Sequence, residues 1–240
     1  MAQDIRVALT LDNKQFNTAL KQSEKNVKGL GTKTAGTTSS VTGLVGAFQA
    51  FIALGAVREI INLTDEFTSL NNRLKAVTTS EVQAASALKL VQQVASETRS
   101  DLSAVSGLFA DITIASEELG LSQERVAGVA KVFSQSLKVS GADAGTAAGA
   151  IRQFGQALAS GVLRGDEFNS INEANSKFMG ELAKAVGVTR GELRNMAEQG
   201  QITAQVMIDA TEQMAGDVEK AFGKTVGTIG DAFTNLRNVI

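Results

Sequence analysis

The sequence predicts a mainly all-α protein of several short-to-medium helices, with a short N-terminal β-strand and a flexible arm. Three observations support this fold class. The chain of 240 residues contains no proline, the residue that most strongly interrupts helical hydrogen bonding. Apolar residues recur at helical spacing over most of the chain after residue 58. Glycine, then an apolar residue, then Ser or Thr repeatedly separates these segments, which is typical of one helix ending and another beginning.

Three such junctions predict short helices folded against each other rather than one long rod. They lie at 119–122, 186–189 and 199–203. In each junction the apolar residue before the Ser/Thr cap has an apolar partner five positions later, which is the spacing of a hydrophobic staple. The pairs are Leu121 with Val126, Val188 with Leu193, and Ile202 with Met207.

The chain divides by composition into an arm and a body. Residues 1–40 contain an alternating strand pattern at 4–12, a polar lysine-rich helix and a Gly/Ser/Thr linker. We expect residues 41–64 to form an apolar helix and 65–215 to form a helical domain. Residues 216–240 are expected to begin a further helical region that is truncated inside a helix, because no stop signal precedes Ile240.

Within the body, breaks at 78–80 and 140–143 separate the expected helices. A helix over 81–98 is predicted to bury Val82, Ala85, Leu88, Val91 and Ala95. Residues 222–240 are predicted to be one glycine-loosened helix. The expected N-terminal caps of the other helices are Ser100 or Asp101, Ser122, Asp143 and Thr203.

The segment 41–57 is the most apolar part of the chain and carries no formal charge. It is shorter than the about 20 apolar residues that span a membrane, and it is diluted by Thr42, Gln49 and four glycines. We expect a helix buried in a core or an oligomer; a segment that enters a bilayer is the alternative. In either case its apolar surface needs a partner. The candidate partner or membrane surface consists of Leu44, Val45, Phe48, Phe51, Ile52 and Leu54.

Composition excludes several kinds of chemistry. Without His or Cys, the usual zinc ligand sets and a Ser-His-Asp triad cannot form. Residues 216–225 resemble a phosphate-binding loop but place six residues between the glycines where the motif requires four. The net charge of −2 and pI of about 5.4 do not suggest a general nucleic-acid binder. We therefore expect no enzyme, no metal or other cofactor, no small-molecule substrate and no nucleic-acid partner.

The stretch 161–193 carries the densest local signals. Gly161 is expected to end one helix and Gly165 to allow a second sharp turn. Asp166 and Glu167 then occupy a helix N-terminus, which favours negative charge. Farther on, Thr189 and Glu192 have the spacing of a capping box. The motif residues are Gly161, Leu163, Arg164, Gly165, Asp166, Glu167, Phe168, Asn169, Ile171, Gly187, Val188, Thr189, Gly191, Glu192 and Leu193.

An alternative function rests on Ala183, Gly187 and Leu193, which have the spacing of a helix-turn-helix. Arg190 and Arg194 would then face a DNA groove from the second helix. Any two short helices joined by a glycine turn produce the same spacing, and the acidic body of the chain opposes phosphate binding. DNA recognition therefore stays the second hypothesis.

The order and spacing of several blocks resemble the N-terminal domain of phage tail tape measure proteins. The blocks are DEFTSLNNRLKAV at 65–77, LFADITIASEELGLSQERV at 108–126, KVSGADAGTAAGAIRQFGQAL at 138–158, GVLRGDEFNSINEA at 161–174 and LAKAVGVTRGELRNMAEQGQITAQVMIDA at 182–210. The resemblance covers roughly residues 55–215. Members of that family commonly have a proline near Asn175 and Ser176, and this chain has none.

The resemblance implies a structural role in a virion tail. A tape measure protein occupies the lumen of the growing tail, and its length sets tail length while tube subunits assemble around it. The implied partners are further copies of the chain, tail-tube, tail-tip or initiator proteins, and assembly chaperones. Contact of 41–57 with the host membrane is a further hypothesis. The implied location is the virion tail, and the host bacterial cytoplasm during assembly.

Overall fold

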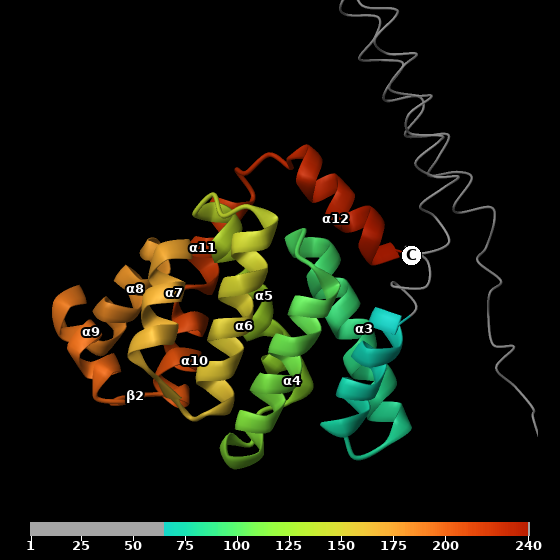
Figure 1. Ribbon diagram of the computed structural model, residues 1–240, viewed down its shortest axis with the longest axis horizontal. Coiled ribbons are helices and arrows are strands. Elements are labelled where there is room, and N and C mark those ends of the chain that lie inside the picture. Colours follow the sequence, from blue (N-terminus) through green and yellow to red (C-terminus); the bar gives the residue numbers. More distant parts are fainter. Residues whose placement is uncertain (1–64, 240) are drawn as a thin grey trace, which may run out of the picture. The chain divides into compact units, whose positions relative to one another are not determined.

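A computed structural model describes residues 65–239 of the chain, all of which belong to one compact unit, 62–240. The predicted N-terminal strand, lysine-rich helix, linker and apolar segment 41–57, with Leu44 to Leu54, lie outside the described residues. The described part is helical apart from one small two-stranded sheet (Figure 1). This confirms the prediction of a mainly all-α fold.

Most of the described helices are short and lie where the sequence signals indicate. Helical residues 65–76 come first. The elements that follow are α3 (Glu81–Thr98), α4 (Leu102–Leu119), α5 (Gln123–Val139), α6 (Ala144–Ala159), β1 (Val162–Leu163), α7 (Gly165–Ala174), α8 (Ser176–Val186), α9 (Arg190–Glu198), β2 (Ile202–Thr203), α10 (Ala204–Gln213), α11 (Ala215–Phe222) and α12 (Ile229–Val239).

Side-chain caps determine where these helices begin. At each of seven N-caps a side-chain oxygen accepts a backbone N–H of the first turn, which satisfies a donor that has no partner inside the helix. The seven residues are Ser80, Asp101, Ser122, Asp143, Asn175, Thr189 and Thr203. The three predicted junctions are confirmed, because Gly120, Gly187 and Gly200 all have φ between 65° and 80°.

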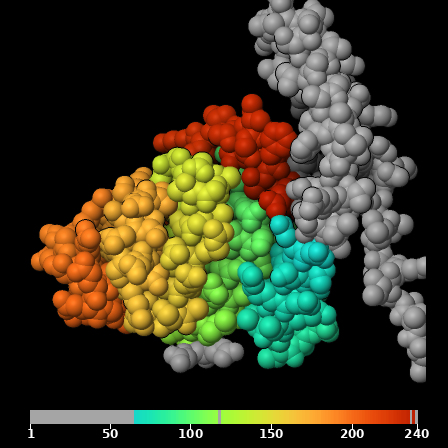
Figure 2. All heavy atoms as spheres, in the orientation of Figure 1, coloured from blue at the N-terminus to red at the C-terminus, as the bar shows by residue number. Residues whose placement is uncertain are grey.

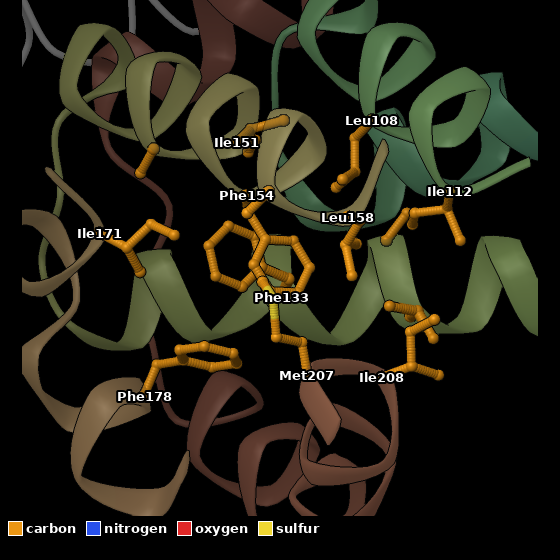
Figure 3. Close-up of a cluster of buried hydrophobic side chains, with 14 of the residues drawn as sticks. Leu108, Ile112, Phe133, Ile151, Phe154, Leu158, Ile171, Phe178, Met207 and Ile208 are labelled. Carbon is orange, nitrogen blue, oxygen red and sulfur yellow. The ribbon is translucent and has the colours of Figure 1, made fainter. Parts of the chain in front are cut away.

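The core forms around α5, which packs against α3, α4, α6, α10 and α11. Figure 3 shows side chains of α4 and α6 on one side of α5 and those of α8 and α10 on the other. The rings of Phe133 and Phe154 stack with centroids 3.9 Å apart, and Phe178 meets both rings edge-on. All three side chains are buried. Aromatic contacts therefore join α5, α6 and α8 in one core.

The close pairing of α4 with α6 depends on a glycine. A Cβ on Gly155 would collide with the carboxylate of Asp111. Because glycine has no side chain, the Asp111 carboxylate can lie directly against the backbone of α6. Burial raises the pKa of Asp111, and the nearby positive charge of Arg73 opposes this increase. A partly buried charge thus lies beside the largest helix–helix contact of the unit.

Two predictions about helices were wrong. On α3 the predicted inner residues Val82 and Ala85 are exposed, Val82 by 80%. The buried face is instead formed by Ala84, Ala87 and Val94, together with the correctly predicted Val91 and Ala95. Residues 222–240 are not one helix, because α11 ends at Phe222 and α12 begins only at Ile229.

Candidate functional site

A two-stranded ladder closes the stretch that carries the sequence motif. Val162 of β1 pairs with Thr203 of β2, and Leu163 pairs with Ile202 in antiparallel register. The N–H of Ala204 also donates to the carbonyl of Gly161 over 2.8 Å. Residues 161–204 therefore form a closed segment in which α7, α8 and α9 lie between the two strands. Figure 1 shows these three helices on the side of the unit away from α3.

The first half of the closed segment contains both a confirmed and a wrong prediction. Gly161 ends α6 with φ of 82°, as predicted. Gly165 is not a turn: it is the first residue of α7, and a Cβ there would come 3.3 Å from Cγ of Glu198. Gly165 thus allows α9 to approach α7. Asp166 and Glu167 lie in the first turn of α7, as predicted.

Asn175 connects α7 to α8 and to the core. Its side chain is fully buried. Its Oδ1 accepts the N–H of Phe178 over 3.1 Å and the hydroxyl of Ser140 over 2.6 Å. Its Nδ2 donates to Oγ of Ser136 over 2.6 Å. One amide therefore caps α8 and binds two side chains at the C-terminal end of α5. In the sequence, this position is notable only because members of the resembled family commonly have a proline there.

The predicted capping box is present at the start of α9. Oγ1 of Thr189 accepts the N–H of Glu192 over 3.3 Å, and Oε2 of Glu192 accepts the N–H of Thr189 over 2.8 Å. The backbone and hydroxyl hydrogen bonds from Thr189 lower the pKa of Glu192. Val188 is partly buried against the core and Leu193 is fully buried. Gly187 has φ of 80° and ends α8.

The structure does not present the two arginines as a DNA-binding helix requires. Nη2 of Arg190 donates to the carbonyl of Ser176, and its guanidinium lies against Gly180, where a Cβ would collide with it. Arg194 instead pairs with Glu198 along the surface of α9 over 3.3 Å. Because Arg190 is turned toward α8 and Arg194 is paired with an acid, the geometry argues against the helix-turn-helix hypothesis.

Most motif residues belong to a buried or an exposed group, while Gly165, Glu167 and Val188 are partly buried. Leu163, Phe168, Ile171 and Leu193 are at most 4% exposed and belong to the hydrophobic core. The exposed group is polar or glycine, and it leaves the closed segment with a polar outer surface. Its members are Gly161, Arg164, Asp166, Asn169, Gly187, Thr189, Gly191 and Glu192.

A second feature, missed by sequence analysis, is the attachment of α12 to the other helices. Nζ of Lys138 on α5 contacts Oδ1 of Asp231 over 2.6 Å. Nδ2 of Asn238 donates to the carbonyl of Ser100 over 2.7 Å, and the N–H of Leu102 donates to its Oδ1 over 3.0 Å. Asn238 thus binds both ends of the turn between α3 and α4. The partners in these contacts are more than 90 residues apart in the sequence, so no local sequence pattern predicts them.

Within residues 65–239, no helix has both the length and the apolar character needed to cross a membrane. In the same range, His, Cys, Asp and Glu side chains do not gather in groups of three or more that could hold a metal ion.

One family model matches most of the chain. It is described as "Tape measure protein" and matches residues 58–240. No curated protein and no solved structure shows a significant match to the chain. The matched range contains every described helix, from 65–76 to α12, as well as the closed segment.

Proposed function

Because the chain belongs to the tape measure protein family, whose members are structural phage tail proteins, we propose that the helices of residues 65–239 form a folded module of a protein that sets tail length and templates tail-tube assembly. The observation that carries this proposal is the family match across the whole described fold. The chain is thus assigned to the virion tail, and we place it in the host bacterial cytoplasm during assembly.

The folded shape of the module suggests which part of that task it performs. A helix rises about 1.5 Å per residue, so the 18-residue helices α3 and α4 each measure only about 27 Å. Successive helices fold back on each other instead of extending the chain. We therefore propose that this module packs against other tail components and does not itself act as the length standard.

We propose that the closed segment 161–204 has an architectural role in this module. Its buried residues, such as Phe168 and Ile171, stabilise the packing of the segment on the core. Its exposed polar residues, such as Arg164, Asp166 and Asn169, are accessible for contacts with partners. The proposed partners are further copies of the chain, tail-tube, tail-tip or initiator proteins, and assembly chaperones. The apolar segment 41–57 is proposed to bind a chaperone or to contact the host membrane.

Two neighbouring substitutions test the proposal in the phage. Ile171→Asp places a charge in the core, whereas Asn169→Asp places the same side chain at an exposed position of α7. We expect Ile171→Asp to abolish tails or to make their length irregular in electron micrographs. The matched Asn169→Asp phage should form tails of normal length. Normal tails from Ile171→Asp phage, in spite of an unfolded module, would contradict the proposed role.

A further inference from the structure

Helix α12 turns its polar side toward the unit to which it belongs. Asp231 is 7% exposed and binds Lys138, and Asn238 binds the turn between α3 and α4. These two residues are seven positions apart, which places them on the same side of a helix. A surface helix normally buries its apolar side, so this arrangement is inverted.

The opposite side of α12 is apolar and open. Ile229 is 79% exposed and Phe233 is 56% exposed, and Val226 just before the helix is 88% exposed. Figure 2 shows α12 at the surface of the unit. In the sequence, apolar residues recur at 229, 233, 236 and 240, which are spaced by four, three and four residues. This is the a/d spacing of a coiled-coil seam, in which Asp231 and Asn238 take the outermost position of the heptad.

We propose that this seam, on the described helix α12 (Ile229–Val239), is an interaction surface that pairs with the same seam of a second copy of the chain. The inference rests on the proposed self-association of the module and assigns it to a surface. Knobs-into-holes packing requires a partner helix with the same period, and a second α12 provides one. Asp231 and Asn238 bind the opposite side of α12 to the rest of the unit. The seam can therefore bind a partner while α12 stays attached to its own unit.

The charges around the seam favour a second copy as the occupant. Gly230 and Ala232, which flank the seam, are small and uncharged, so two helices can approach closely. Arg237, the charged flanking residue, already contacts both carboxylate oxygens of Glu66 over 2.7 Å. Two copies therefore meet without opposing like charges, whereas a strongly charged partner would find little to bind.

The size of the seam predicts a weak pairing. One buried aromatic side chain removes about 150–250 Å² from solvent, so one Phe and a few aliphatic residues bury a few hundred Å² per copy. A stable interface buries about 800 Å² per partner. Pairing should therefore depend on concentration and strengthen when copies are held side by side.

Disulfide trapping in the full chain tests the pairing directly, because the natural sequence has no cysteine. The variants are Ile229→Cys and Phe233→Cys on the seam, and Val82→Cys on α3, which is 80% exposed, as the matched control. We expect both seam variants to form oxidised dimers if the helices are parallel. If the helices are antiparallel, positions 233 and 236 face each other, so a mixture of Phe233→Cys and Leu236→Cys chains should form the oxidised dimer instead. The Val82→Cys chain should give only collisional background.

A charge on the seam provides the second measurement. In sedimentation equilibrium, Phe233→Asp should raise the dissociation constant of the dimer about tenfold or more. The control Val82→Asp should leave this constant unchanged. Seam variants that form no more dimer than the Val82→Cys control, alone or mixed, would overturn the pairing. If such a chain were nevertheless found in tails, the proposed function would stand and only the pairing would be wrong. Absence of the chain from tails would overturn the proposed function, whereas the disulfide-trapping result would still show whether the two helices pair.

Discussion

Lys138 of α5 and Asp231 of α12 form a 2.6 Å ion pair in which the two side chains are only 8% and 10% exposed. The carboxylate of Asp231 also accepts the N–H of Thr228 over 2.9 Å, and the N–H of Asp231 donates to the Thr228 hydroxyl over 3.0 Å. A single carboxylate therefore caps the start of α12 and attaches the helix to the core helix α5.

Removing one member of this pair should destabilise the attachment of α12 more than removing both. Lys138→Met leaves the Asp231 charge buried without its partner, which typically costs about 3–5 kcal/mol. We expect a loss toward the lower end of that range, because Thr228 still binds the carboxylate. In the double variant Lys138→Met with Asp231→Asn, part of the lost free energy of unfolding should be recovered. Urea unfolding of the wild type, the two single variants and the double variant measures the coupling energy between the two side chains. Strictly additive losses would show that the pair does not interact.

Acid should weaken the same attachment. Burial raises the pKa of Asp231, but the hydrogen bonds from Lys138 and Thr228 and the Lys138 charge outweigh it, so the pKa lies below its ordinary value of 3.8. The stabilisation is therefore present above the unfolded-state pKa and is lost as the pH falls through the lower folded-state pKa.

Urea unfolding at a series of pH values checks this assignment. The stability gap between the wild type and Asp231→Asn should be constant near neutral pH and should narrow at about pH 4 and below. A gap that stayed constant into strong acid would show that the Asp231 charge does not stabilise the fold. Exposed Asp217→Asn serves as the control, with the same chemical change on α11.

Phe178 should contribute strongly to stability, because it attaches the closed segment to the core. It is 2% exposed and meets the Phe133 and Phe154 rings at centroid distances of 4.9 and 5.5 Å. Phe178→Ala should cost about 3–5 kcal/mol through lost burial and the remaining cavity. Phe178→Leu, which fills more of the space, should cost clearly less. Equal losses for Ala and Leu in urea unfolding would contradict this packing role.

A proline at position 176 should be tolerated. Ser176 is the first residue of α8 and is exposed, and the first helical position accepts proline because its N–H has no partner within the helix. Its carbonyl, which binds Arg190, is unaffected by the change. We expect Ser176→Pro to alter the free energy of unfolding by less than about 1 kcal/mol. Thermal unfolding measures this, and Lys177→Pro, one position farther into the helix, provides the comparison. A loss as large as that of Phe178→Ala would show that the backbone of this turn rejects proline.

The sequence predicted those features that are governed by neighbouring residues. The caps at Asp101, Ser122 and Thr189 depend on hydrogen bonds within one turn, so their residue types alone identify them. On α3, in contrast, the larger apolar residues Val82 and Leu88 favour one face of the helix, whereas the face that is buried contains the smaller Ala84 and Ala87. Packing against α4 and α5 selected the face with Ala84 and Ala87 and left Val82 in solvent.

Features that join distant parts of the chain were not predicted. The ladder between β1 and β2 is two residues long on each side, and its strands are separated by three helices. Such a pair has no periodicity that a sequence pattern could show. The contacts of Asn175 with Ser136 and Ser140 and of Asp231 with Lys138 likewise depend on the tertiary fold. Most residues of the closed segment are therefore recognisable from the sequence, whereas the pairing of β1 with β2 is not.

The measurement that tests the central claim most directly is peptide mass spectrometry of purified tails, with the intact mass of the gene product. The proposed function predicts peptides from 65–239 in washed tail particles, at a constant ratio to the tail-tube protein across preparations. Host cytoplasmic proteins measured in the same samples give the background. A chain that is abundant in infected cells but no more abundant in tails than this background would contradict a structural role in the tail.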